Sequence, residues 1–303
     1  MSKRVVSLIP SSTEIVAALG CGDQLVGRSH ECDYPPSVKK LPVCTEPKMS
    51  TVGSSSEIDR SITTLLANAL SVYRVFPDVL QRVRPDVIVT QTQCEVCAVN
   101  LKDVEEAIGQ LANSDPEIVS LQPLDLDHVW NDIERVAKVL DARQEGERLV
   151  HELRARMANI ASHNFPTKPT VACIEWIEPL MAAGNWIPTL VELAGGVDLF
   201  GQAGLHSPKI HWDEMRQADP DIIMLLPCGF DIPRTMRDMS ILQDQPDWSS
   251  MNAVRNGRVF VTDGQQYFNR PGPRLVESLQ ILAEIFHPDR FHFGHEGSGW
   301  RRF

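Results

Sequence analysis

Two cysteines separated by two residues are the feature of the sequence with the most chemical potential, in Gln91-Thr92-Gln93-Cys94-Glu95-Val96-Cys97. They follow the apolar run Val87-Ile88-Val89, which predicts a buried strand, and they precede a helix expected after Asn100. A thiol near a helix N-terminus ionises more readily, and the thiolate is the form that binds metals and attacks disulfides. Cys94 and Cys97 thus admit three interpretations: ligation of a metal or cluster, redox chemistry, or inert packing.

The metal interpretation needs further ligands, because a closed zinc site takes four and no second Cys-x-x-Cys occurs in the chain. His30, Cys32 and Cys44 could supply them, and His30, Cys32 or Cys94 could instead be the axial ligand of a metal-bearing tetrapyrrole. The redox interpretation lacks the tryptophan and glycine context of thioredoxin-like motifs. Inert burial is common for free cysteine. The predicted metal-binding residues are His30, Cys32, Cys94 and Cys97.

Strands and helices that would position these residues alternate from the start of the chain. Val5 to Ile9 is apolar and rich in β-branched residues, which predicts a buried strand. Ser11-Ser12-Thr13-Glu14 has the spacing of a capping box, so a helix is expected from there to Leu19, ending at Gly20. This is the first half of a βαβ unit.

An internal repeat indicates two similar α/β lobes. Each half contains a strand, a helix that ends at glycine, a further short strand, and a later helix end that leads into a strand through Pro-Asp. The matching pairs are Val5–Ile9 with Val171–Trp176, Ile15–Gly27 with Leu190–Gly201, Val83–Val89 with Ala218–Met224, and Glu117–Leu121 with Arg258–Thr262.

Between the repeats, residues 126–163 contain no proline and have apolar residues at helical spacing. Asp141 is expected to divide this stretch, and the second helix, from Gln144 to Ser162, would be about 28 Å long. The predicted organisation is an N-terminal α/β lobe at 1–124, a linker with this helix at 125–165, and a C-terminal α/β lobe at 166–303.

Several ordered motifs carry a resemblance to a known family. They are Arg4-Val5-Val6-Ser7-Leu8-Ile9-Pro10-Ser11-Ser12-Thr13-Glu14, Asp33-Tyr34-Pro35-Pro36, Arg84-Pro85-Asp86-Val87-Ile88-Val89, Leu193-Ala194-Gly195-Gly196, and Trp248 with Gly257-Arg258-Val259. In this order the chain resembles the class III substrate-binding proteins of ABC importers, and most of all the cobalamin-binding branch. The resemblance implies a class III periplasmic-binding-protein-like α/β fold, with two Rossmann-like lobes joined by a single long connecting helix. It also implies a ligand held without turnover in the cleft between the lobes. Relatives bind cobalamin, siderophores, haem or metal ions, so the fold alone does not fix the ligand.

Loops that follow the strands are the expected ligand site, because parallel α/β sheets bind ligands outside the carboxyl ends of their strands. Aromatic residues in these loops suit a large flat ligand such as a corrinoid or another tetrapyrrole. Tyr34 lies in the family's Asp-Tyr-Pro-Pro turn, where the resemblance implies that the aromatic borders the ligand. Ser11 and Ser12 could hold a ligand anion or only cap their helix. The predicted ligand-binding residues are Ser11, Ser12, Tyr34, Gln93, Trp176, Asn185, Trp186, Phe230, Tyr267, Phe268 and Arg270.

Composition excludes other classes of protein. A formal net charge of −11 argues against nucleic-acid binding, which needs a clustered basic surface. The apolar run at Val5–Ile9 is too short for a signal peptide or a membrane span, and seven cysteines without a regular framework fit reduced thiols, so a cytoplasmic location is expected. GxGxxG, GxxxxGK[ST] and GxSxG motifs are absent from the sequence, which weakens dinucleotide, P-loop and hydrolase readings.

Two functional hypotheses follow from the sequence. In the first, the chain is a non-enzymatic binding protein for a corrinoid or similar metal chelate, with an ABC-transporter permease as a further partner. Exported relatives present one carboxylate per lobe to the transporter, and Glu57 and Glu192 lie at roughly matching places. In the second, the chain is a cytoplasmic metal- or cluster-binding protein or enzyme that uses Cys94 and Cys97 with Cys32 and His30.

Overall fold

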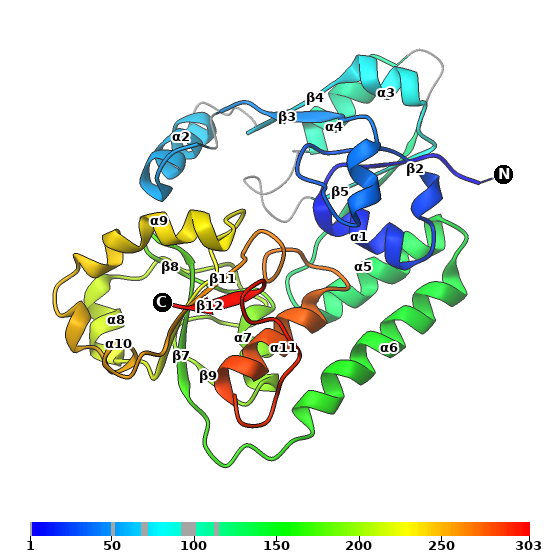
Figure 1. Cartoon of the computed structure of the whole chain (residues 1–303). Coiled ribbons are helices and arrows are strands. Elements are labelled where there is room, and N and C mark those ends of the chain that lie inside the picture. Colours follow the sequence, from blue (N-terminus) through cyan, green and yellow to red (C-terminus); the bar gives the residue numbers. More distant parts are fainter. Residues whose placement is uncertain (1, 50–51, 68–71, 92–100, 112–114) are drawn as a thin grey trace. The chain divides into compact units, whose positions relative to one another are not determined.

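The computed structural model describes residues 2–49, 52–67, 72–91, 101–111 and 115–303 (Figure 1). The chain divides into two compact units. Unit 1 comprises Met1–Gly53, Glu57–Pro123 and Asp127–Glu152, and unit 2 comprises Ser54–Ser56, Leu124–Leu126 and Leu153–Phe303. The expected α/β fold with two lobes is confirmed, whereas the domain limits proposed from the sequence stay a prediction.

Unit 1 is built on a parallel sheet of four strands in the order β2-β1-β5-β6. The strands are β1 (Val5–Ser7), β2 (Leu25–Arg28), β5 (Val87–Gln91) and β6 (Glu117–Leu121). Both central strands are buried at every position, as expected for strands covered on both faces. Apart from the insertion described next, the helices that follow the four strands β1, β2, β5 and β6 are, in this order, α1 (Pro10–Ala18), α3 (Pro77–Val83), α4 (Leu101–Ile108) and α5 (Leu126–Val139).

An insertion between β2 and α3 was not predicted from the sequence. It contains β3 (Thr45–Pro47), α2 (Ser55–Ala67) and β4 (Tyr73–Val75). Strands β3 and β4 pair antiparallel, with Thr45 opposite Val75 and Pro47 opposite Tyr73. The corresponding stretch of unit 2, residues 199–211, contains no named helix or strand.

Unit 2 is built on a sheet in the order β12-β11-β10-β7-β8, and β9 pairs with the start of β7. Its strands are β7 (Thr170–Trp176), β8 (Met181–Ala182), β9 (Val197–Asp198), β10 (Ile222–Leu225), β11 (Val259–Thr262) and β12 (Trp300–Arg302). β7, β9, β10 and β11 are parallel, while β8 and β12 run antiparallel to their neighbours. The helices are α7 (Ile187–Leu193), α8 (Trp212–Ala218), α9 (Ile232–Gln243), α10 (Asn252–Arg255) and α11 (Leu275–Phe286).

The internal repeat is confirmed by strand order, because β2-β1-β5-β6 recurs as β9-β7-β10-β11. A matched hydrogen bond closes each repeat. The Asp86 carboxylate accepts the backbone N–H of Arg4 at 2.7 Å, and the Asp221 carboxylate accepts that of Thr170 at 2.9 Å. In both units the Pro-Asp sequence thus joins the start of one central strand to the start of its neighbour.

Helices α5 and α6 (Arg143–Ala161) confirm the predicted division of the stretch between the repeats. Asp141 separates them and has a left-handed backbone, with φ of 59°. The buried apolar side chains of α6, Leu149, Val150, Leu153, Met157 and Ile160, recur at helical spacing and form one face. Unit 1 ends and unit 2 begins within this helix.

The predicted capping box at the start of α1 is wrong. The helix begins at Pro10, and its N-cap Ile9 makes no side-chain capping hydrogen bond. Proline is suited to the first helical position because it has no N–H to satisfy and its φ is already helical. Ser11 is therefore inside the first turn, and the Ser12 hydroxyl donates backward to the Ile9 carbonyl at 3.0 Å. The predicted end of the helix is confirmed, since Leu19 is its C-cap and Gly20 has φ of 76°.

A buried carboxylate organises the C-terminal segment of unit 2. Glu284 of α11 accepts backbone N–H groups from Phe293 and Gly294 and, at 2.8 Å, the indole N–H of Trp300. Trp300 begins β12, which completes the edge of the sheet against β11. A single side chain thereby holds the last strand and the turn before it.

Candidate functional site

The carboxyl ends of β1 and β2 lie together in unit 1, because these strands are parallel neighbours. The Ser29 N–H, just after β2, donates to the Ser7 carbonyl at the end of β1 at 2.8 Å. His30 and Cys32 follow directly, so both are held at the edge of the sheet where parallel α/β folds bind ligands.

A buried cluster of polar side chains lies at this carboxyl edge, between β1, the start of α1 and the loop after β2. The Ser7 hydroxyl lies 2.6 Å from the hydroxyls of both Ser12 and Thr13, and Thr13 donates to the Cys32 sulfur at 3.0 Å. None of these side chains is more than 1% exposed, and Ser11 is also buried. Burial argues against direct ligand contact by the hydroxyls of Ser11 and Ser12 and by the thiol of Cys32.

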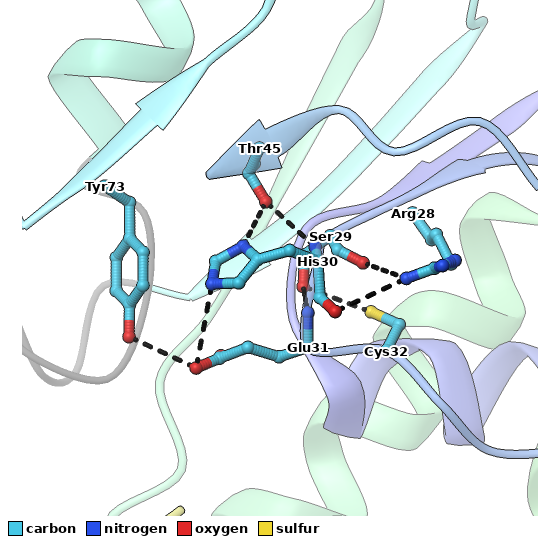
Figure 2. A network of polar contacts seen from close by, with 7 residues as sticks. All are labelled: Arg28, Ser29, His30, Glu31, Cys32, Thr45 and Tyr73. Atoms are coloured by element: carbon cyan, nitrogen blue, oxygen red, sulfur yellow. Dashed lines mark hydrogen bonds and ion pairs between the residues drawn. The ribbon is translucent and has the colours of Figure 1, made fainter. Parts of the chain in front are cut away.

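The imidazole of His30 is held from three sides (Figure 2). Its Nδ1 lies 2.8 Å from the Thr45 hydroxyl oxygen, which also accepts the backbone N–H of His30 at 3.1 Å. The ring of Tyr73 packs beside it, with centroids 5.3 Å apart. Its Nε2 lies 3.9 Å from the carboxylate of Glu31, which in turn accepts the Tyr73 hydroxyl at 3.4 Å. The insertion therefore fixes a ring that belongs to the loop after β2.

Burial controls the protonation of the groups around this ring. It lowers the pKa of His30, an effect that Arg28 strengthens and Glu46 opposes. It raises the pKa of the Cys32 thiol, and it raises that of Cys44 to about 12. At neutral pH the imidazole is thus in the neutral form that can bind a metal, whereas both thiols stay protonated.

Tyr34 is the accessible aromatic residue of this part of unit 1. Its side chain is 43% exposed, in the turn that follows Cys32. A tyrosine here offers a broad, rigid face to a flat ligand. Its role in binding stays a prediction.

In unit 2, an aromatic pair lies at the carboxyl ends of two neighbouring parallel strands. Trp176 ends β7 and Phe230 follows β10, and their ring centroids are 5.1 Å apart. The guanidinium of Arg234 lies 4.1 Å from the Phe230 centroid and bonds to Asp238 at 3.0 Å. Phe230 is buried whereas Trp176 is partly exposed, so Trp176 is the member of the pair that solvent can reach.

Two other predicted residues of unit 2 lie together but are buried. The Trp186 indole N–H donates to the Phe268 carbonyl at 2.7 Å, and the two side chains are 6% and 0% exposed. Asn185 is 8% exposed and has a left-handed backbone, with φ of 53°. The side chain of Phe268 fills the core of unit 2, which argues against a direct ligand contact for it.

The loop after β11 carries the remaining predicted residues, Tyr267 and Arg270. Arg270 is 6% exposed, and the guanidinium of Arg274 lies 5.4 Å from the Tyr267 ring centroid. Asp263 accepts the Gln266 backbone N–H at 2.9 Å and its side-chain amide at 3.1 Å. Burial raises the pKa of the Asp263 carboxyl. Hydrogen bonds and a cation–π contact among these side chains thus hold the loop in place.

Gln93, Cys94 and Cys97 lie outside the described residues, so their predicted roles stay predictions. Among the residues that the structure does describe, no group of three or more His, Cys, Asp or Glu side chains could hold a metal ion. In the same part of the chain, every helix is too short or too polar to cross a membrane.

Sequence reasoning missed four side chains that define these surroundings: Glu31, Thr45, Tyr73 and Arg234. Arg234 and Asp238 have the spacing of a helical ion pair, which could have been recognised. Thr45 and Tyr73 reach His30 and Glu31 only through the pairing of β3 with β4, and the sequence contains no local signal for that contact.

Comparison with known proteins identifies relatives along nearly the whole chain. Residues 5–266 match the model of the family described as periplasmic binding protein. An ABC transporter substrate-binding lipoprotein of Bacillus subtilis is 25% identical over 296 residues, which cover 95% of this chain and 81% of that protein. A vitamin B12-binding protein of Vibrio cholerae is 22% identical, over 93% of this chain and 88% of that protein. A periplasmic heme-binding protein from Roseiflexus has a similar fold, with a TM-score of 0.69 and 22% identity, over 95% of this chain and 99% of that chain.

Proposed function

We propose, from the premise that the chain belongs to the periplasmic binding protein family, that its ligand is a tetrapyrrole of the corrinoid type. Proteins of this family bind solutes and are not enzymes, and this chain is a substrate-binding protein of the type that serves ABC importers. Relatives described as binding vitamin B12 or heme support a tetrapyrrole as the ligand.

The aromatic pair Trp176 and Phe230 is the observation that carries the proposal. Its rings are 5.1 Å apart at the carboxyl ends of β7 and β10, and Trp176 is partly exposed. A rigid indole face loses little conformational entropy when it covers a flat macrocycle. Arg234 contacts the ring of Phe230, and the Glu178 carbonyl accepts the Trp176 indole N–H at 3.0 Å, so each ring of the pair has its own support.

Further residues from the sequence prediction belong to the same proposal. Tyr34 would add a second accessible ring, whereas Arg270, which is buried, would support the loop after β11. Trp186 and Asn185 would support the site from within the core of unit 2, since both are buried.

Absorbance titration of the purified chain with hydroxocobalamin, and separately with ferric haem, tests the proposal. Trp176→Ala should weaken binding of the true ligand by about 1 kcal/mol, which is roughly fivefold, because one aromatic contact is lost. Tyr34→Ala should weaken it by a similar factor.

The matched control is Phe303→Ala. Phe303 is also an exposed aromatic residue, at 39%, but its backbone bonds to Val259 at the opposite, amino end of β11. Binding should be unchanged in this variant. If the unmodified chain binds haem but not hydroxocobalamin, the corrinoid assignment is wrong, and if it binds neither, the tetrapyrrole class is wrong as well.

The proposed protein partner of the chain is the permease of an ABC transporter. Glu57 and Glu192 are both exposed and are the candidate docking carboxylates. Glu57→Lys with Glu192→Lys should abolish copurification with the cognate permease, while the exposed control Glu296→Lys should not. Unchanged copurification would remove both residues from the docking surface. The cytoplasmic location expected from the sequence stays a prediction, which cell fractionation checks.

A further inference from the structure

The contacts of His30 leave one ring nitrogen without a hydrogen bond. Nδ1 lies 2.8 Å from the Thr45 hydroxyl. Nε2 makes no hydrogen bond to the described residues, and its distance of 3.9 Å from the Glu31 carboxylate exceeds that of a hydrogen bond. The side chain is 23% exposed, so solvent reaches the ring.

The ring is also fixed in orientation. Thr45 is buried and set in place by the pairing of β3 with β4, and it accepts the backbone N–H of His30 as well. Tyr73, at the start of β4, packs beside the imidazole, with the ring centroids 5.3 Å apart. A histidine that only filled space at the surface would not need contacts from both strands of an insertion (Figure 2).

These features together form the arrangement of a metal-ligating histidine. Such residues bind the metal through one ring nitrogen and donate the other N–H to a fixed acceptor, which sets the tautomer and the direction of the lone pair. With the proton on Nδ1 donated to Thr45, the lone pair is on Nε2. Cys32 lacks these features, since it is 1% exposed and its sulfur accepts a hydrogen bond from Thr13.

We propose that Nε2 of His30 is the axial ligand to the metal of the bound tetrapyrrole, which rests on the proposed function and narrows it. The ligand would then be one whose metal has an exchangeable axial position, either the iron of haem or the cobalt of a corrinoid that carries water as an axial ligand. Binding is a ligand exchange: the Nε2 lone pair replaces a water on the metal, the water leaves, and no electron is transferred.

Ferric haem and diaquacobinamide are the two probes that test this inference. Each is titrated into the unmodified chain and into His30→Gly, with absorption spectra for both and electron paramagnetic resonance for haem. The unmodified chain should give the spectrum of an imidazole-ligated metal with at least one probe. In His30→Gly that signature should be lost and affinity should fall about tenfold or more. The probe that responds identifies iron or cobalt as the metal.

Imidazole rescue separates ligation from a structural role. Added imidazole should restore the ligated spectrum of His30→Gly, because it can enter the space left by the ring, whereas a merely misfolded variant would not recover. Thr45→Val should keep ligation but change the ligand field of the metal. Thr45→Ser, which keeps the hydroxyl, should give the same spectrum as the unmodified chain. His163→Gly, which alters an exposed histidine of unit 2, is the matched control and should behave as the unmodified chain does.

The outcomes distinguish this inference from the function on which it rests. If a probe binds and His30→Gly has the same spectrum and affinity, His30 is not the ligand and only this inference is overturned. A spectrum of phenolate ligation that is lost in Tyr73→Phe would overturn it in favour of Tyr73. If neither probe binds the unmodified chain, this inference is overturned, and the tetrapyrrole proposal is overturned with it when hydroxocobalamin does not bind either.

Discussion

Unit 1 and unit 2 share one strand order but differ at the carboxyl edge of their sheets. Both have the arrangement β2-β1-β5-β6, which becomes β9-β7-β10-β11 in unit 2, and both close it with a Pro-Asp carboxylate. At the carboxyl edge, unit 1 has an imidazole held by an insertion, whereas unit 2 has a tryptophan packed on a phenylalanine. The comparison separates what the repeat preserves, the amino edge and the core, from what has diverged, the loops that bear chemistry.

The physical reason lies in the different constraints at the two edges. Backbone N–H groups at the start of a central strand must be satisfied, and Asp86 and Asp221 do this in the same way. Loops beyond the strand ends have no such shared requirement, so their length and composition can change without disturbing the sheet.

The largest effect on stability is expected from core residues at equivalent positions in the two units. Ile88 in β5 and Ile223 in β10 are both fully buried, and each is central in its sheet. Replacement of either by alanine should lower the free energy of unfolding by about 3 to 4 kcal/mol, from lost burial and the cavity left behind. Urea denaturation followed by circular dichroism measures both. A loss below about 1 kcal/mol in either variant would contradict the equivalence of the two cores.

Glu284 tests the attachment of β12, an edge strand that has no counterpart in the described four-stranded sheet of unit 1. Glu284→Ala removes the acceptor for Gly294 and Trp300 and should destabilise the chain by about 3 kcal/mol, because buried donors lose a charged partner. Amide exchange should rise in β12 above all. Glu296→Ala, an exposed glutamate of the same segment, is the control and should change little. Unaltered exchange in β12 would mean that Glu284 does not hold the strand.

The paired carboxylates at the amino edge should differ in strength. Asp221 accepts the Thr170 N–H and hydroxyl and the Asn252 amide, whereas the exposed Asp86 accepts the Arg4 N–H. Asp221→Ala should therefore cost about 2 kcal/mol, and Asp86→Ala should cost less. Thermal unfolding of the two variants side by side measures the difference, and a larger loss in Asp86→Ala than in Asp221→Ala would contradict the prediction.

Acidification should have the smallest effect, and in the same direction for both units. Burial lowers the pKa of His30 in unit 1 and of His287 in unit 2. The unfolded chain takes up these protons near pH 6.5, above the folded pKa, so stability is full above that pH and falls as the pH drops below it. His30→Gln or His287→Gln should each reduce this slope, by at most about 1.4 kcal/mol per pH unit. Urea denaturation at several pH values checks the sign, and an unchanged slope in both variants would contradict it.

The sequence was sufficient to predict the repeated frame. Strands β5 and β10 begin with the continuous apolar runs Val87–Val89 and Ile222–Leu225, each preceded by Pro-Asp, and both signals are local. The division at Asp141 was also predictable, because helical spacing is interrupted there. The capping box failed although Ser11 and Glu14 had the right spacing, since Pro10 started the helix before Ser11.

The candidate site was predictable only in part, because its contacts join distant segments. His30 was recognised from its place after a strand, but Thr45 is 15 residues away and Tyr73 is 42 residues from Glu31. Burial of Ser12, Cys32 and Phe268 could not be read from the sequence either, since it depends on partners that other elements supply. Residue type and position after a strand therefore indicate a candidate, but not whether its side chain is accessible.

The insertion that carries Thr45 has a consequence for protein engineering. A designer who grafts only the loop after β2 onto another α/β scaffold would transplant the imidazole without the hydroxyl that aims it. The smallest transferable module is the loop together with β3 and β4, because the donor atom and its support are encoded in separate pieces of chain. Copying the loop alone should yield a freely rotating histidine with weak affinity for metals.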